Sequence, residues 1–314
     1  MDGIARAEVT SRTAVNKRKP LFSLLLPYLL IAPTMILVFI FTVYPSINSV
    51  VDSLYDPARN ARDPSEFVGL QNYADLFDPD HYIGSAFVQI IGQTLIFAVA
   101  TVVISVPLAL LFALLLNRKV PLQGVWRFSL FYPSLLPLIG AASIWAFLFS
   151  DTVGLINTVL RSFGGRGVNW LGDPGFVLWA VIAVNVWKQA GYYMIFYLAG
   201  LQNIPRDFYE AASLDGANSW QQFRFLTLPL LRRTTLFILV VAFTFAFQTV
   251  EQLQVLGMGG PGDRSNLLLY YIFQTIPERR NWGYVNAMTV VLVLILLVFT
   301  VSNFVLFERG REDE

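Results

Sequence analysis

Residues 87–116 read FVQIIGQTLIFAVATVVISVPLALLFALLL, thirty consecutive positions without one charged side chain. The hydrocarbon core of a bilayer is about 30 Å thick, and a helix needs roughly 20 apolar residues to cross it. The stretch is too long for a strand and does not alternate between apolar and polar residues, so a transmembrane barrel is not indicated. We interpret residues 87–116 as a transmembrane helix that tilts or begins outside the bilayer.

Five other stretches have the same character. The six predicted spans are residues 21–44, 87–116, 128–149, 176–201, 234–256 and 284–307. Charged residues make up 14% of the 314 residues, and the mean hydropathy is +0.57. A soluble domain carries about 25% charged residues, so an ordinary soluble protein is excluded. The predicted fold class is all-α, a polytopic membrane protein with six transmembrane helices.

The first span follows the basic residues Lys17, Arg18 and Lys19, as the core of a signal peptide would. It covers 24 residues, whereas signal cores run to about 15, and no clear cleavage site follows. We therefore interpret it as a retained span. With the N-terminus inside, the inner segments hold fourteen Lys and Arg residues and the outer segments seven. This excess predicts that both termini are cytoplasmic.

The predicted organisation is an N-terminal tail, 1–20, a six-span domain, 21–308, and a C-terminal tail, 309–314. The first outer segment, 45–86, is rich in Asp, Pro and Asn and should form a small cap. The second, 150–175, is expected to hold a brief interfacial helix and a turn. The third begins with four glycines within residues 257–262. We interpret that cluster as a turn, because glycines permit tight backbone geometry.

The inner connection, 202–233, is too polar to insert and too apolar to be a disordered tail. Its helix signals are, in order, Pro205, Asp207, Glu210, Gly216, the pair Ser219 and Gln222, and Pro229. Proline and carboxylates suit a first helical turn, and glycine suits a left-handed stop. Ser219 and Gln222 have the spacing of a capping box, and Pro229 is expected to kink or end the second helix. The segment is predicted to form two short helices around a glycine joint.

These residues resemble the EAA loop of bacterial ABC importer permeases. The matching positions are Glu210, Ala211, Ala212, Gly216, Leu226, Leu228 and Pro229, with Leu226 standing where Ile is usual. Residues 67–73, FVGLQNY, and 191–205, which lead into the loop, resemble carbohydrate-uptake permeases. Residues 259–261, GGP, with Gly283 and Tyr284, look like the maltose and glycerol-phosphate subclass.

The resemblance implies a type I ABC importer permease fold in the bacterial inner membrane. The chain would form half of the pathway for a sugar or sugar-like solute delivered by an external binding protein. Expected partners are a second, non-identical permease and two ATPase subunits. The residues expected to couple to the ATPase are Glu210, Ala211, Ala212, Gly216, Leu228 and Pro229.

No enzymatic activity is expected of this chain. None of its four lysines follows a glycine as a P-loop requires, so ATP and Mg²⁺ are expected on the separate ATPase and no cofactor on this chain. The absence of Cys and the single histidine, His81, exclude thiolate metal sites and sites built on two imidazoles. The net charge of +1 gives no reason to expect nucleic acid as a partner.

Polar residues inside two spans are the candidate solute pathway: Asn185, Lys188, Gln189, Tyr192, Thr244, Gln248, Glu251 and Gln252. Lys188 would lie about 18 Å into the fourth span, where a charge is costly and usually functional. The first four residues share one helix face by spacing, as do the last four. The pattern leaves three roles open for Lys188: solute contact, an interhelical network and pairing with a partner carboxylate. Pro133 and Pro137 are expected to kink the third span.

Two other functions must be compared with the importer permease, which are a secondary transporter and a membrane enzyme. An ion-coupled secondary transporter would need a self-sufficient fold, often with an inverted repeat, and the two halves of this sequence show no convincing repeat. A membrane enzyme would need a nucleophile with a base or a metal cluster, and no such constellation is present. The ABC importer permease therefore leads, with the secondary transporter as the alternative.

Overall fold

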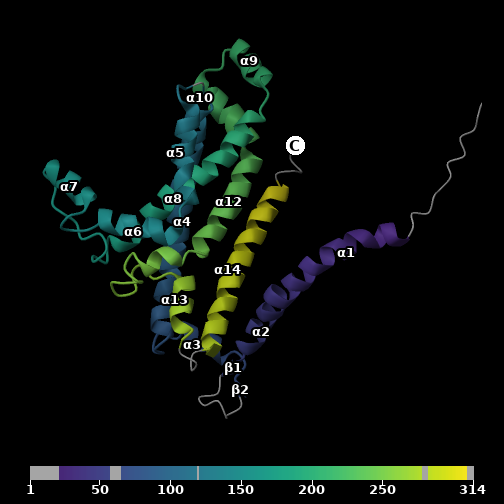
Figure 1. Cartoon of the computed structure of the whole chain (residues 1–314), viewed down its shortest axis with the longest axis vertical. Coiled ribbons are helices and arrows are strands. Elements are labelled where there is room, and N and C mark those ends of the chain that lie inside the picture. The colour runs from purple at the N-terminus through teal and green to yellow at the C-terminus, as the bar shows by residue number, and fades with distance from the viewer. Residues whose placement is uncertain (1–20, 57–64, 119, 278–281, 310–314) are drawn as a thin grey trace, which may run out of the picture. The chain divides into compact units, whose positions relative to one another are not determined.

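The computed structural model describes residues 21–56, 65–118, 120–277 and 282–309, and these are mostly helical (Figure 1). The predicted N-terminal tail, 1–20, and all of the C-terminal tail beyond residue 309 lie outside the described residues. The chain divides into two compact units, Met1–Asn48 and Ser49–Glu314.

The first predicted span is longer than its hydrophobic pattern indicated. Helix α1 (Leu21–Val38) continues without interruption through the π-helical turn η1 (Phe39–Val43) into α2 (Tyr44–Asp52). The part from Leu26 to Asp52 is long and apolar enough to cross a membrane, and none of its most apolar stretch is buried. Such a helix needs lipid or another chain around it. Helix therefore continues through residues 45–52, the first part of the segment expected to form the cap.

The second unit contains the other long helices, which are α4 (Gly84–Leu116), α5 (Gln123–Leu135), α6 (Leu138–Leu148), α8 (Val177–Gln202), α12 (Arg232–Phe247) and α14 (Trp282–Arg309). In the described residues four helices are long and apolar enough to cross a membrane, or five if α5 and α6 form one broken span. The pair α5 and α6 bends by 101°, which confirms the predicted kink. Helix α8 is long enough to cross a membrane, with 26 residues, but it is not one of these four helices because it carries several polar residues. The number of spans, six, stays a prediction.

The fifth predicted span is only partly helical, and this corrects its prediction. Helix α12 ends at Phe247, and the chain turns before the short 3-10 helix η3 (Glu251–Gln254). Thr244 thus lies on α12, while Gln248 and the residues after it do not. The prediction that Thr244, Gln248, Glu251 and Gln252 share one helix face is wrong, because that spacing applies only to a continuous helix.

The outer segments form short elements. Strands β1 (Tyr55–Asp56) and β2 (Glu66–Phe67) pair antiparallel, and α3 (Gln71–Phe77) follows them. The second outer segment holds α7 (Leu155–Ser162), as predicted, and then a turn at Gly164 with φ of +81°. The third places positive φ angles at Gly257, Gly259 and Gly262 before α13 (Leu268–Thr275), so the glycine cluster does form turns.

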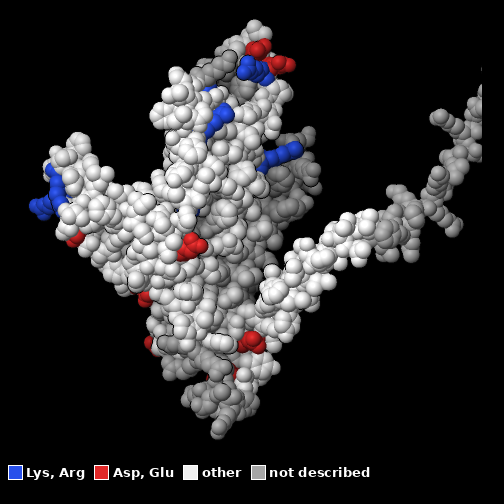
Figure 2. All heavy atoms as spheres, viewed as in Figure 1, with Lys and Arg blue, Asp and Glu red and all other residues white. Residues whose placement is uncertain are grey.

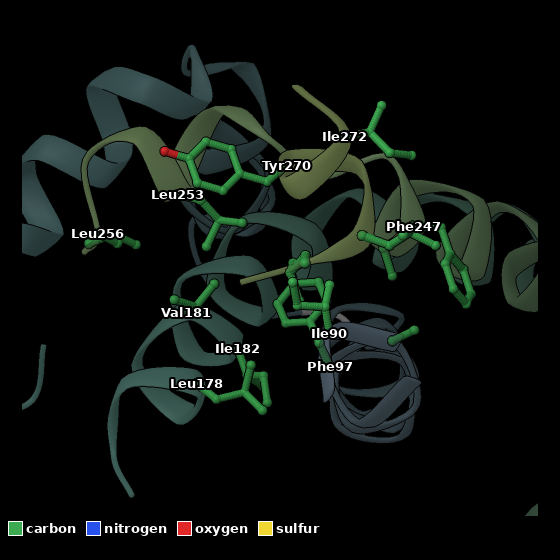
Figure 3. Packing of buried hydrophobic residues seen from close by; sticks show 14 of the residues in the cluster. Ile90, Phe97, Leu178, Val181, Ile182, Phe247, Leu253, Leu256, Tyr270 and Ile272 are labelled. Atoms are coloured by element: carbon green, nitrogen blue, oxygen red, sulfur yellow. The ribbon is translucent and has the colours of Figure 1, made fainter. Parts of the chain in front are cut away.

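The buried core consists of two clusters along α4 and α8. One joins the first halves of these helices to α6, η3, α13 and α14, and its members include Ile90, Phe97, Val181, Phe247 and Leu253 (Figure 3). The other joins their second halves to α12. Helix α8 packs against α4, α5, α6 and α12, so it is the common support of the second unit.

The inner connection forms α9 (Arg206–Leu214), α10 (Ser219–Gln221), the π-helical η2 (Gln222–Thr227) and α11 (Leu228–Leu230). In Figure 2 charged side chains gather near the α9 end and on α7, and most of the face between them is uncharged. This distribution fits a belt of lipid or partner contact between two polar ends.

Candidate functional site

The inner connection folds as two short helical segments around a glycine, as predicted. Helix α9 ends at Leu214, and Gly216 adopts φ of +82°. The Gly216 amide donates to Ser213 O at 3.1 Å, and the Ala217 amide donates to Ala212 O at 2.9 Å. These bonds satisfy the last carbonyls of α9 in the manner of a left-handed helix stop.

The cap of the second segment differs from the prediction by one residue. Asn218 rather than Ser219 is the N-cap. Its side-chain Oδ1 accepts a hydrogen bond from the backbone N–H of Gln221 at 2.9 Å, and its backbone N–H donates to Gln221 Oε1 at 2.8 Å. Asn is an N-cap residue as good as Ser, and here its backbone has the extended conformation that a cap requires. The capping box is therefore Asn218 with Gln221, and the predicted pair is wrong.

The two helical segments are braced against each other. The hydroxyl of Tyr209 on α9 lies 3.0 Å from that of Thr227 on η2. Gln222 Nε2 donates to Ser213 Oγ at 2.9 Å and to Ala217 O at 3.2 Å. The second segment also passes through Pro229, which sits in the first turn of α11, and the chain turns only at Leu231. The helix thus ends one residue after Pro229, in agreement with the prediction that this proline kinks or ends it, because proline has no amide to continue the helical hydrogen bonds.

The predicted coupling residues lie on the outside of this loop. Glu210, Ala211, Gly216 and Pro229 are exposed, and Ala212 and Leu228 are half-buried. A hollow of about 400 Å³ lies between the two segments, and its lining includes Ala212, Gly216 and Phe225. Leu214 beside it is 90% exposed.

Helix α8 keeps the four predicted polar residues on one face, because it is continuous from Val177 to Gln202. Lys188 is 9% exposed and lies against the break between α5 and α6. Its Nζ donates to three carbonyls, those of Pro133 at 3.3 Å, Ser134 at 3.0 Å and Leu136 at 2.5 Å. An ammonium has three donors, so these contacts occupy all of them.

The other members of the α8 face have different surroundings. Asn185 is 3% exposed, and its Nδ2 donates to Thr249 Oγ1 at 3.2 Å, just after the end of α12. Gln189 and Tyr192 are half-buried. The ring of Tyr192 lies 5.9 Å from that of Phe245 on α12. The structure thus brings the α8 face to the end of α12 through Asn185 and Tyr192.

The four polar residues near the end of α12 do not form one surface. Thr244 is half-buried and donates to Val240 O at 2.8 Å, while Gln248 and Glu251 are exposed. Gln252 is fully buried, and neither of its side-chain polar atoms has a partner among the residues that the structure describes. A buried amide without a partner is rare and costly, so Gln252 is the member of this group that most needs a further contact.

Sequence reasoning missed three residues that shape these sites. Thr249 receives the Asn185 bond, and Asn218 caps α10. Gly191 lies where a Cβ would come within 1.7 Å of Leu130 O, so α5 and α8 touch backbone to backbone there. For the contact of Gly191 with Leu130, the sequence did offer a signal, which is a glycine inside a long apolar helix. Small residues permit close packing of helices in membranes.

A family model described as binding-protein-dependent transport system inner membrane component matches residues 105–309. This chain belongs to that family. The match includes the loop 202–233, α8 and the residues after α12, so both candidate sites lie inside the family domain. The chain is therefore a membrane permease component of an ABC importer, and such a component is not itself the ATPase.

Curated relatives match this permease over nearly its whole length. The sulfoquinovosyl glycerol transport system permease protein SmoG of Agrobacterium fabrum is 33% identical over 88% of each chain. The sn-glycerol-3-phosphate transport system permease protein UgpA of the same organism is 34% identical and covers 91% of this chain and 95% of its own. The trehalose/maltose transport system permease protein MalF of Thermococcus litoralis is 32% identical, with coverages of 92% and 95%.

Solved structures share the fold of this permease. A chain of a bacterial ABC transporter involved in the import of alginate superimposes with a TM-score of 0.78 at 22% identity, over 92% of this chain and 98% of that one. A chain of the alginate transporter in complex with an alginate pentasaccharide-bound periplasmic protein gives a TM-score of 0.76 at 23% identity. The architecture is thus that of a type I importer permease.

Proposed function

We propose that this permease forms half of the translocation pathway for a carbohydrate or a related polyol derivative. The observation that carries the proposal is the set of relatives that match about nine-tenths of the chain, whose names specify sulfoquinovosyl glycerol, glycerol 3-phosphate and trehalose or maltose. Each of these four solutes bears two or more hydroxyl groups. A pathway for them needs amide and hydroxyl partners beside aromatic surfaces.

The α8 face and the end of α12 supply such groups. Gln189 and Tyr192 on α8 are half-buried rather than sealed in the core, and Gln248 and Glu251 after α12 are exposed. Phe245 lies beside Tyr192 and is 36% exposed. These residues can donate to and accept from hydroxyls while the rings cover apolar ring faces. We assign them, with Asn185, Thr244 and Gln252, to the solute pathway.

The inner loop is proposed to be the contact with the ATPase. Its two segments are braced by hydrogen bonds, its glycine joint is fixed, and its hollow can hold a partner side chain. Glu210 offers a charge-assisted bond to a basic residue of the ATPase. Glu210→Ala should remove about 1.5–3 kcal/mol of that contact. Less ATPase should then co-purify, and the choice of solute should be unchanged.

The complete importer is proposed to contain this permease, a second and non-identical permease, two ATPase subunits that bind ATP and Mg²⁺, and an external solute-binding protein. The subclass resemblance of residues 259–261 supports the non-identical partner. Purification of an active homo-oligomer without a second permease would contradict this composition. Both termini are proposed to lie in the cytoplasm.

Reconstitution tests the function directly. Proteoliposomes would contain this permease with its candidate partner permease and ATPase, and the binding protein would be added outside. Uptake of maltose, glycerol 3-phosphate and, as a control, histidine would be measured with and without ATP. We expect uptake of a polyhydroxylated solute that requires both ATP and the binding protein. Uptake by this chain alone under an ion gradient would instead establish a secondary transporter.

A further inference from the structure

The break between α5 and α6 leaves backbone carbonyls without helical partners at membrane depth. Helix α5 ends at Leu135, and Pro137 has no amide to donate back along the chain. The carbonyls of Ser134 and Leu136 lie in this gap. In a bilayer there is no water to satisfy such groups, so another part of the protein must do so.

Lys188 of α8 supplies the missing donors. Its three N–H groups reach Pro133 O, Ser134 O and Leu136 O, and Lys188 is buried, with 9% of its surface exposed. The C-terminal end of a helix carries a partial negative charge, so a cation is favoured there. Lys188 therefore acts as a cap that α8 provides to the end of α5.

A second contact fixes the same two helices one turn away. At Gly191 the backbone of α8 lies so close to Leu130 O that a Cβ would be 1.7 Å from it. Residues 130 and 134 ascend along α5 while residues 191 and 188 descend along α8, as expected for antiparallel neighbours. Two contacts at different heights fix both the spacing and the register of the pair.

This pair joins the two candidate sites. Helix α8 ends at Gln202, and α9 of the inner loop begins four residues later at Arg206. Beyond the break, α6 packs against η3, which holds Glu251 and Gln252. A movement of α9 can therefore reach η3 through α8, the capped break and α6.

We propose that Lys188 and Gly191 form a two-point lock that makes α5 and α8 move as one body and passes movement of the inner loop to α6 across the break. Lys188 is then a positioning residue and not a contact of the solute. The proposal rests on the proposed transport function only in that the chain works in an ATP-driven importer.

The test uses the assembled importer in proteoliposomes. Because the sequence contains no Cys, a spin-label pair can be introduced by Ile144→Cys on α6 and Arg206→Cys at the start of α9, which are both exposed and lie outside the hollow of the inner loop. The distance between the labels would be measured before and after trapping with ATP and vanadate. Uptake and ATP hydrolysis would be measured on the same complexes without labels. The variants are Lys188→Met, Lys188→Arg, Lys188→Gln and Gly191→Ala, with Ile195→Val on the exposed side of α8 as the matched control.

For Lys188→Met and Gly191→Ala we expect about tenfold less solute carried per ATP hydrolysed, which is in the range that mutations in a coupling network produce. The label distances should broaden and lose their response to ATP. Lys188→Arg restores charge and donors and should recover most of the coupling, and Ile195→Val should behave as the parent.

Parental coupling and label distances in Lys188→Met would overturn the lock, as would a change in solute preference with coupling intact. If neither Lys188→Met nor Gly191→Ala assembles, Lys188→Gln decides, since it keeps two N–H donors at the break and removes the charge and the third donor: parental coupling and label distances in that variant overturn the proposal. Failure of the carbohydrate assignment can be told apart from failure of the lock. If only the solute class is wrong, the label distance in the importer without the Lys188 or Gly191 substitution still responds to ATP.

Discussion

Gly216 adopts φ of +82° between α9 and α10, and no heavy atom lies within 4 Å of the place where its Cβ would be. Glycine is thus required there by the backbone conformation and not by a lack of space.

Asn157 shows the opposite case, in which the side chain itself is required. Its Nδ2 donates to Ser150 O, Asp151 O and Val168 O, and its Oδ1 accepts from the Val168 amide and Trp170 Nε1. Single residues therefore fix the shape of the inner loop and of the second outer segment.

Gly216→Val should weaken the inner loop by about 1–2 kcal/mol or more, because a β-branched residue is strongly disfavoured at positive φ. The amount of ATPase that co-purifies and the rate of uptake should both fall. Gly92→Val is the matched control, since Gly92 lies on α4 with open space around its Cβ position and without positive φ. Equal uptake by the two variants would show that the loop does not need the left-handed joint.

Asn157→Asp should destabilise the second outer segment by about 2 kcal/mol or more, since it removes the two Nδ2 N–H donors that three carbonyls share and faces a carboxylate toward those carbonyl oxygens. The measurements are the thermal midpoint of the purified complex and the rate of proteolysis within residues 150–175. Asn169→Asp serves as the control, because Asn169 is exposed and its Oδ1 only accepts, from the Gly172 amide. If both variants are cleaved at the same rate, Asn157 does not organise the segment.

At the scale of elements, the outer cap is tied to the start of α14. Asn72 of α3 donates to Ser53 O at 2.8 Å and to Tyr55 O at 3.0 Å, and the Tyr73 hydroxyl lies 2.6 Å from Ser53 Oγ. Tyr284 of α14 donates to Asp75 Oδ2 at 2.8 Å. Part of the FVGLQNY segment thus has a structural role, because its Asn and Tyr fasten α3 to the chain that leaves α2.

Gly283→Ala should loosen this cap, since the new Cβ would lie 2.6 Å from Tyr55 O and 2.8 Å from Asn72 Nδ2. In a Ser53→Cys background, a membrane-impermeant maleimide should label the buried thiol several-fold faster after the change, as expected when local opening becomes cheaper. Gly124→Ala, which meets no atom within 4 Å, provides the comparison. Unchanged labelling in the Gly283 variant would mean that the cap does not depend on this close approach.

At the scale of the whole molecule, α8 connects the buried core to both candidate sites. It packs against four other helices, bears the polar face and continues into the inner loop. Exposed apolar surface is extensive elsewhere, as on Phe41 at 74% and Val298 at 62%. A chain with this surface needs lipid and partner subunits, which fits the family to which it belongs.

The proposed orientation predicts which loops face outward. Phe163 in the second outer segment and Leu122 in the first inner loop are 86% and 74% exposed, so a cysteine at either place should be similarly reactive. In spheroplasts, an impermeant maleimide should label Phe163→Cys at once and Leu122→Cys only after the membrane is permeabilised. The reverse pattern would place both termini outside and overturn the orientation inferred from the Lys and Arg distribution.

The sequence by itself determined the helical membrane class, the helix–glycine–helix form of the inner loop and the kink at Pro133 and Pro137. These features depend on composition and on neighbours a few residues apart, where apolar runs, proline and glycine act directly. The same local logic placed the α8 polar face, because a continuous helix fixes which residues share a side.

Only the tertiary structure decided where α12 ends and what Lys188 contacts. Gln248, Glu251 and Gln252 follow Thr244 at helical spacing, so the local pattern could not show that the chain leaves the helix at Phe247 and turns Thr249 toward Asn185. Nor could it show that Lys188 meets carbonyls more than fifty residues earlier in the sequence, or that Gly191 lies against Leu130. The physical reason is that a polar group in a membrane is satisfied by whichever partner the packing of distant helices brings within hydrogen-bond reach, and that partner is not encoded in local spacing.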